Sequence, residues 1–361
     1  MGHKNDSWDY FSPKEVLTVQ DILALQKKIV PELVEILEKR YNILTTIYHN
    51  EPIGRRVLAS ELNLGERVVR TEINLLKSQN LIEINTPGMT VTEEGRIVVE
   101  KLKGFIHEIK GLTNIEEYIK EKLGLRDVII VPGDVEENSA VLKELGKAAA
   151  SYTKDIIKNN DIIAITGGST IKKVVEAFPK TNNYSNILVI PARGGMGRNV
   201  ESQANMLAAN LAHKLNGSYK LLHIPENVSA EVLSGLLKER QVKEVIDLIP
   251  KANILIYGIG NAIHMAKKRG TAEENIEKLI ELGAVGEAFG CYFDENSNVV
   301  SENNSIGINI SDAKKINTHI AVAAGKNKVE SIIATESNNS NAVLVTDEAA
   351  GIKIAEKLKA F

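Results

Sequence analysis

Short runs of apolar, often β-branched residues alternate with helix-length segments along residues 112–361, and this alternation limits the possible folds more than any other feature. The runs occur at 127–133, 161–168, 186–195, 220–225, 252–260, 319–325 and 341–347. Segments of helical length lie between them, at 137–159, 169–178, 200–215 and 229–249. Apolar strands joined by crossover helices form parallel sheets covered on both faces. The pattern therefore predicts an α/β domain with a doubly wound parallel sheet.

Residues 1–111 follow a different pattern, so we expect two domains, at 1–111 and 112–361. Apolar residues at helical spacing predict a helix over 32–49. Residues 55–96 then predict a short helix at 55–62, a tight turn, a longer helix at 66–79 and a two-stranded wing over 81–92. This order is typical of a winged helix-turn-helix domain, here followed by a linker helix.

The helix expected at 66–79 has two distinct faces. Val69, Ile73 and Leu76 recur at i, i+4 and i+7 and would pack inward. Arginine and asparagine on the opposite face can pair with guanine and adenine edges in the major groove, and basic side chains nearby can hold phosphates. The predicted contacts to double-stranded DNA are Arg67, Arg70, Thr71 and Asn74, with Arg55, Arg56 and Lys77 on the phosphates.

Two observations keep alternatives open for this part of the chain. Residues 1–111 contain 15 Lys and Arg against 16 Asp and Glu, a net charge of −1, and winged helices also serve as protein-docking modules. Apolar residues from Val98 to Leu112 are spaced 4, 3, 4 and 3, as in a coiled-coil seam. This seam predicts either a homo-oligomer, dimer or tetramer, or packing within one chain.

Composition excludes several classes of protein. Apolar residues make up 43% and charged residues 25%, which is ordinary for a globular protein. The longest stretch without a charged residue, 252–266, is too short and too polar to span a membrane. The single cysteine, Cys291, cannot form an internal disulfide, so we expect a cytoplasmic protein. Cysteine pairs are absent, which gives no reason to expect a metal site.

Glycine-rich loops follow several of the expected strands, where ligands bind in open α/β sheets. Residues 166–170, Thr-Gly-Gly-Ser-Thr, open a helix, and such a loop suits a phosphate on a small molecule. Arg193 follows the next strand and could hold phosphate oxygens, whereas Glu287 could accept hydrogen bonds from sugar hydroxyls. Lys326 or Lys328 could meet a second phosphate. Each loop alone could equally be a structural turn.

Taken together, these motifs resemble the sorbitol-operon-regulator (SorC) family of sugar-binding transcriptional regulators. The resemblance covers nearly the whole chain. Its motifs are GGST at 167–170, PARGG at 191–195, VESQAN at 200–205, GIG at 258–260, AVGEAFGCYFDENS at 284–297 and AVAAGKNKVESIIA at 321–334. Within the family, the chain is most similar to bacterial repressors of glycolytic genes.

The resemblance implies a repressor whose effector is a phosphorylated sugar, fructose 1,6-bisphosphate in the most similar group, and no cofactor. It also implies which residues hold the effector. These are Gly167, Gly168, Ser169 and Thr170 around one phosphate, together with Arg193, Gln203, Lys268, Arg269, Glu287 and Lys328. In this resemblance Lys268 stands where the family has an arginine after the GIG loop, which affects how the second phosphate is held.

An enzyme is the alternative, because sugar-phosphate isomerases and deaminases resemble the same domain. The deaminases place an aspartate and a histidine after the GIG loop. Aligned on that loop, His264 matches the histidine, but Ala262 stands at the aspartate position. Without the carboxylate that orients the imidazole, we expect a binding domain and no catalytic residues. A DNA-binding protein that senses no sugar is a third hypothesis.

Overall fold

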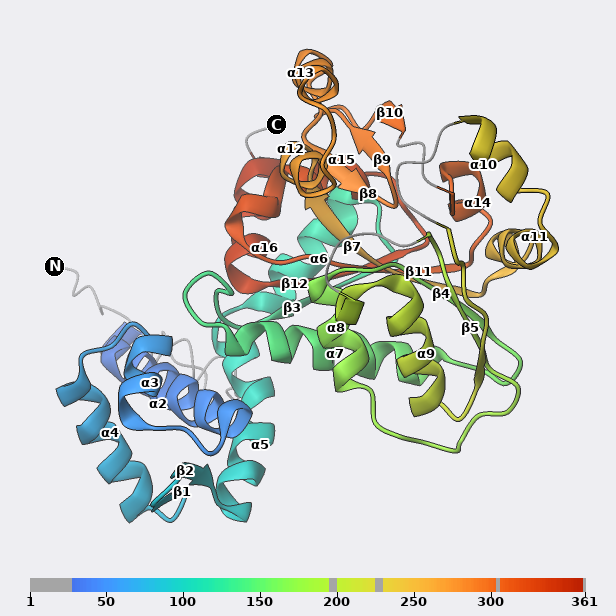
Figure 1. The fold of residues 1–361 in the computed structure, drawn as a ribbon. Helices are drawn as coiled ribbons and strands as arrows, with labels where there is room; N and C mark the ends of the chain where they lie inside the picture. Colours follow the sequence, from blue (N-terminus) through green and yellow to red (C-terminus); the bar gives the residue numbers. More distant parts are fainter. Residues whose placement is uncertain (1–27, 195–199, 225–229, 303–305, 360–361) are drawn as a thin grey trace, which may run out of the picture.

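The computed structural model describes residues 28–194, 200–224, 230–302 and 306–359. The N-terminal part is a small helical domain, and the C-terminal part is a larger domain built on a sheet (Figure 1). The first domain comprises α2 (Pro31–Asn50), α3 (Arg55–Glu61), α4 (Glu66–Ser78), β1 (Ile82–Asn85), β2 (Gly88–Val91) and α5 (Glu93–Ile109). This order of elements confirms the predicted winged helix-turn-helix.

The core of the small domain follows the predicted periodicity. Val69, Ile73 and Leu76 of α4 are buried and belong to one apolar cluster with Ile43 and Ile47 of α2. The wing is an antiparallel pair in which Ile82 lies opposite Val91. α4 is therefore held on three sides, and its polar face remains exposed.

The large domain contains a sheet whose main part is parallel. Its strands, in order across the sheet, are β3 (Asp127–Val131), β12 (Ala342–Asp347), β11 (Thr318–Val322), β7 (Ile254–Asn261), β4 (Ile162–Ile165), β5 (Leu188–Pro191) and β6 (Ser218–Tyr219). Their nearly continuous apolar sequences are explained by burial on both faces. This confirms the predicted fold class.

Helices cover both faces of this sheet. One apolar cluster joins it to α7 (Ala140–Ile156), α8 (Ser169–Ala177) and α9 (Ala204–Lys214). A second cluster joins the other face to α6 (Leu112–Leu123), α11 (Arg240–Ile246), α15 (Val329–Glu336) and α16 (Glu348–Lys359). The remaining helices are α10 (Ala230–Leu236), α12 (Ala262–Lys268), α13 (Glu273–Glu281) and α14 (Ile310–Ala313), and short 3-10 turns are η1 (Val200–Ser202), η2 (Ile249–Lys251) and η3 (Lys326–Lys328).

An antiparallel extension was not predicted from the sequence. The last residues of β7 leave the parallel sheet and pair with β8 (Gly286–Ala288), which pairs with β9 (Cys291–Phe293) and then β10 (Val299–Glu302). Strands of three residues give too short an alternation to recognise. The extension matters because it carries Glu287 to the carboxyl end of β7.

Three local predictions need correction. In the apolar run 220–225, residues 220–224 are not a strand, because β6 ends at Tyr219, and residue 225 lies outside the described residues. In the segment 229–249, residues 230–249 contain α10 and α11 instead of one helix, and residue 229 lies outside the described residues. The seam over 98–112 is not one helix either, because α5 ends at Ile109 and Gly111 adopts a left-handed conformation with φ of 64°. Leu112 begins α6 and is buried in the core of the large domain.

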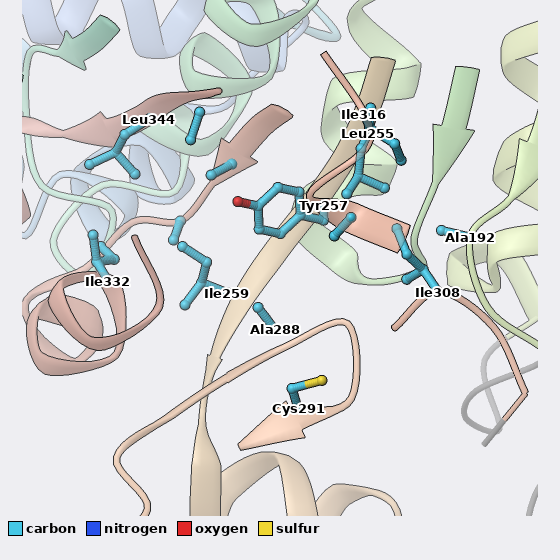
Figure 2. Close-up of a cluster of buried hydrophobic side chains, with 14 of the residues drawn as sticks. Ala192, Leu255, Tyr257, Ile259, Ala288, Cys291, Ile308, Ile316, Ile332 and Leu344 are labelled. Carbon is cyan, nitrogen blue, oxygen red and sulfur yellow. The ribbon is translucent and has the colours of Figure 1, made fainter. Parts of the chain in front are cut away.

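Tyr257 of β7 lies at the centre of the core on one face of the sheet, among the side chains labelled in Figure 2. Its hydroxyl donates to both carboxylate oxygens of Glu336, at 2.8 and 2.9 Å. Its ring contacts that of Phe289 edge-on, with centroids 4.9 Å apart. Because Phe289 lines the cavity described next, this core supports one wall of it.

Candidate anion site and nucleic-acid interface

The topology creates a crevice between β4 and β7. From β4 the chain proceeds outward to β5 and β6, and it then returns to β7 on the other side of β4 and proceeds to β11 and β12. At such a switch point the loops after the two strands diverge, and ligands bind between them. A cavity of about 200 Å³ lies there. It is lined by all the predicted effector residues except Gln203, namely Gly167, Gly168, Ser169, Thr170, Arg193, Lys268, Arg269, Glu287 and Lys328.

The loop after β4 delivers the start of α8 to the cavity. Gly168 has a φ of 128°, a conformation that favours glycine, and its N–H donates to Ser202 O at 2.8 Å. Ser169 and Thr170 lie in the first turn of α8. This first turn contains no acidic residue, and the helix has no side-chain cap at its N-terminus. The unpaired N–H groups and the dipole of a helix N-terminus favour an anion at this end of the cavity.

Arg193, Glu287 and Arg269 form a buried charged group. Glu287 Oε1 lies 2.7 Å from Arg269 Nη2 and 3.7 Å from Arg193 Nη1. It also accepts a hydrogen bond from Gly290 N at 2.6 Å. Arg193 is only 3% exposed, and its Nε and Nη1 have no hydrogen-bond partner within the described chain. Burial lowers the pKa of Arg193. Burial acts in the same direction on Arg269, but Glu287 and Tyr292 together more than offset it and raise the pKa of Arg269.

Glycine is required beside this group. Gly290 has a φ of 87°, and a Cβ built there would lie 1.7 Å from Arg193 Nη1. The tight β8–β9 turn thus brings its backbone directly against the guanidinium. As a result, the guanidinium is kept at the cavity wall and away from solvent, where an anion would meet it at low dielectric.

Lysines complete the charge of the cavity. Lys328 ends the turn η3 and lines the cavity, and burial lowers the pKa of its ammonium group. Lys326, two residues earlier, instead pairs with Asp134 at 2.8 Å and does not line it. With Lys268, Arg193 and Arg269, the described lining residues carry an excess of positive charge over the single carboxylate of Glu287. This arrangement suits a ligand with more than one negative charge.

Gln203, the remaining predicted residue, stands at the N-cap position of α9 without a side-chain cap hydrogen bond and does not line the cavity, although its neighbour Ala204 does. An apolar wall of Ile259 on β7, Met265 on α12 and Phe289 in the β8–β9 turn was not predicted, because the three residues come from different elements and form no pattern in the sequence.

Of the two positions compared with the related enzymes, the histidine position lies in the cavity wall and the aspartate position does not. His264 lines the cavity. Its backbone N–H donates to Oδ1 of Asn261, the N-cap residue of α12, at 3.0 Å. Ala262, where the deaminases place an aspartate, is fully buried. Among the described residues, no group of His, Cys, Asp and Glu is arranged to hold a metal ion.

The predicted DNA-facing residues lie together on the small domain. Arg67, Arg70, Thr71, Asn74 and Lys77 are exposed on α4, and Arg55 and Arg56 are exposed at the start of α3. Behind them, Glu72 is buried and pairs with Lys39 at 2.7 Å and Arg40 at 2.9 Å. Burial alone would raise the pKa of Glu72, but the hydrogen bonds from these two cations lower it. Glu72 therefore holds α4 against α2, and it forms no ion pair with the basic residues on the exposed face of α4.

Comparison with known proteins supports this architecture. The family described as "Putative sugar-binding domain" matches residues 107–355, and the one described as "CggR N-terminal DNA binding domain" matches residues 36–106. The central glycolytic genes regulator of Bacillus subtilis is 41% identical over 336 residues, which is 93% of this chain and 99% of that protein. The protein of the same name from Priestia megaterium is 38% identical, over 92% of this chain and 97% of its own length.

Solved structures of similar proteins have the same architecture. "The putative SorC family transcriptional regulator from Enterococcus faecalis" has a TM-score of 0.63 at 34% identity, covering 67% of this chain and 99% of that one. The full-length sorbitol operon regulator of Klebsiella pneumoniae has a TM-score of 0.63 at 17% identity, covering 88% of this chain and 98% of its own, which shows a shared fold. No helix in the described ranges combines the length and apolarity needed to cross a membrane.

A winged helix joined to a sugar-binding α/β domain defines a DNA-binding transcriptional regulator, and not an isomerase or deaminase of related fold. More narrowly, the chain belongs to the family of the central glycolytic genes regulators.

Proposed function

We propose that the protein represses glycolytic genes by binding operator DNA, and that fructose 1,6-bisphosphate bound in the cavity at the β4–β7 switch point relieves this repression. The observation that supports it most is the buried guanidinium of Arg193. Its Nε and Nη1 have no hydrogen-bond partner among the described residues, and Arg193 lines a cavity that also contains the N-terminus of α8. A buried cation of this kind is costly unless an anion pairs with it.

The geometry favours a ligand with two phosphates. One phosphate would accept hydrogen bonds from the first N–H groups and hydroxyls of α8, with Arg193 beside it. The other would lie between Lys268 at the end of α12 and Lys328 at the end of η3, which both line the cavity. Glu287 Oε1 is occupied by Arg269 and Gly290, so Oε2 is the oxygen available to accept from a sugar hydroxyl.

Operator recognition would depend on α4 and on a homo-oligomer. The exposed polar face of α4 has the side chains that read base edges, and Lys77, Arg55 and Arg56 would hold phosphates. Helix-turn-helix proteins bind as dimers to half-sites one helical turn apart. We therefore expect at least a dimer of this chain on its operator.

Thermal melting of the full chain tests the effector. Fructose 1,6-bisphosphate, fructose 6-phosphate, glucose 6-phosphate and inorganic phosphate are each added in excess. A ligand at 100 times its dissociation constant stabilises by about 2.7 kcal/mol, which corresponds to a rise of about 5–10 °C in melting temperature for a domain of this size. We expect the largest rise with the bisphosphate.

A matched pair of variants locates the binding. Lys328→Met should lose most of this rise, whereas Lys326→Met, two residues away and outside the cavity, should keep it. Retention of DNA by the unchanged protein should then fall when the bisphosphate is added. Equal rises with mono- and bisphosphates would leave a sugar monophosphate as the effector, and no rise with any of them would support the sugar-independent DNA-binding protein.

A further inference from the structure

Two adjacent acidic residues at the end of β12 contact different parts of the molecule. Asp347 is fully buried, and its carboxylate accepts from Gly325 N at 2.9 Å and from Val135 N at 3.0 Å. Glu348, the first residue of α16, accepts from Gly133 N at 2.7 Å and from Lys110 Nζ at 2.8 Å. One side chain therefore holds a loop of the large domain, and the next holds the linker from the small domain.

The Asp347 side leads to the cavity. Gly325 begins the turn that carries Lys328, and Lys328 N donates to Gly325 O at 3.0 Å. Gly325 has a φ of 99°, so the path of the turn is set at this residue. Asp347 is therefore a positioning residue for the Lys328 side of the cavity, although it does not line the cavity itself.

The Glu348 side leads to the winged helix. Lys110 is the C-terminal cap of α5, and its ammonium group also lies 3.4 Å from Glu38 Oε2 on α2. The side chains of Lys110 and Glu348 are each 16% exposed, so solvent screens this contact less than it screens a surface pair. Lys110 thus joins α2 of the small domain to the start of α16 in the large one.

We propose that the Asp347–Glu348 junction transmits occupancy of the Lys328 side of the cavity to the winged helix. An anion that binds Lys328 moves the turn that begins at Gly325, and this turn is hydrogen-bonded to Asp347. A movement of Asp347 also moves Glu348, because the two residues are consecutive. The bridge from Glu348 through Lys110 to Glu38 then changes, and with it the position of α2 and α5. This proposal rests on the proposed function, since it requires an anionic effector that alters DNA affinity.

The test uses the full chain and three variants. Glu348→Gln keeps an acceptor for Gly133 N but loses the charge that holds Lys110. Glu330→Gln is the control, because Glu330 makes an exposed pair with Lys357 within the large domain. Glu144→Gln is a second control, since Glu144 contacts the small domain at His49 and Lys103 but does not line the cavity.

Two measurements are made on each protein. The first is amide hydrogen exchange of α2 and α5, which requires no effector. The second is the ratio of dissociation constants for a DNA duplex with and without fructose 1,6-bisphosphate; the duplex is selected by the unchanged protein from a random-sequence pool. We expect Glu348→Gln to exchange faster in α2 and α5 and to reduce the ratio at least about threefold, with bisphosphate binding retained. Glu330→Gln should behave as the unchanged protein.

Each outcome decides the proposal. An unchanged exchange pattern and ratio in Glu348→Gln would overturn it, and so would an equal loss of the ratio in Glu144→Gln, since any loosening of the domains would then suffice. If Glu348→Gln does not fold, Lys110→Gln removes the bridge from the other side. If the unchanged protein shows no response to the bisphosphate, the proposed effector is wrong, and the exchange data alone decide whether Glu348 holds the winged helix.

Discussion

The carboxylate of Glu144 on α7 lies 2.5 Å from Nε2 of His49 on α2, so a buried acid of the large domain is paired with a residue of the small one. The second carboxylate oxygen accepts from Lys103 of α5 at 2.9 Å. Lys147, one turn further along α7, lies 3.2 Å away. Burial alone would raise the pKa of Glu144, but the hydrogen bond from His49 and the charges of the two lysines hold it well below its usual range. The domains therefore meet through a charged group.

Glu144→Gln is expected to lower the stability of the protein by about 1–3 kcal/mol, because His49 and Lys103 would lose their buried partner. A carboxylate with a lowered folded-state pKa contributes stability above its unfolded pKa, near 4.5, and loses it as the pH falls. The melting temperatures of the two proteins should therefore differ at pH 7, and the difference should become smaller toward pH 3. An equal separation at both pH values would contradict this account, and Glu330→Gln serves as the exposed control.

DNA reading is expected to separate into two kinds of contact on α4. Arg70→Ala should weaken binding by about 1–3 kcal/mol and relax sequence preference at one base pair, if the guanidinium reads a base edge. Lys77→Ala should weaken all duplexes alike and make the affinity less dependent on salt. Lys243, exposed on α11 of the large domain, provides the control. Duplex binding at several salt concentrations measures both effects, and unchanged affinity in the two α4 variants would mean that this surface docks a protein.

The sequence predicted those elements whose periodicity is local. α4 was predictable because Val69, Ile73 and Leu76 recur at helical spacing, and the same spacing exposes Arg70 and Asn74. The parallel strands were predictable because each is an uninterrupted apolar run followed by a glycine loop. Arg193 was a candidate from its place after a strand, whereas only the resemblance favoured Lys328 over Lys326. The topology brings Arg193 and Lys328 to one crevice.

Contacts between distant segments were not predictable in this way. Glu144 and His49 are 95 positions apart, and nothing near either residue indicates a partner. The strand carrying Glu287 was missed because β8 has three residues and its pairing depends on the end of β7. Run 220–225 looked like a strand because it is apolar, but Leu222 and Ile224 are buried as coil.

Glu336 is expected to reduce stability at alkaline pH. Its carboxyl is completely buried beside Tyr257, and burial raises its pKa to about 7. For an acid with a raised folded-state pKa, the folded protein binds the extra proton between the unfolded pKa and pH 7, so stability falls as the pH rises through this window. Glu336→Gln removes the ionisation and keeps an amide that can hydrogen-bond to Tyr257. We expect it to raise stability by about 1–3 kcal/mol at pH 8 and to have little effect at pH 5, whereas a loss at both values, measured by thermal melting, would contradict the assignment.

The affinity for the bisphosphate is expected to fall at alkaline pH because of Lys328. Burial lowers the pKa of its ammonium group, so the lysine loses its charge at a lower pH than an exposed lysine does. A phosphate monoester gains its second charge near pH 6. Affinity should therefore rise from pH 5 to 7 and fall again as the pH approaches the lowered pKa of Lys328. Calorimetric titrations at pH values that cover both the rise and the fall measure how the affinity depends on pH.

The variant Lys328→Arg separates the lysine from other causes of the alkaline fall. Arginine remains protonated at every pH used, so this variant should keep the acid limb, which belongs to the ligand, and lose the alkaline limb. Lys326→Arg, two residues away and paired with Asp134, should keep both limbs. If the alkaline fall persisted in Lys328→Arg, then Lys328 would not be the group that titrates.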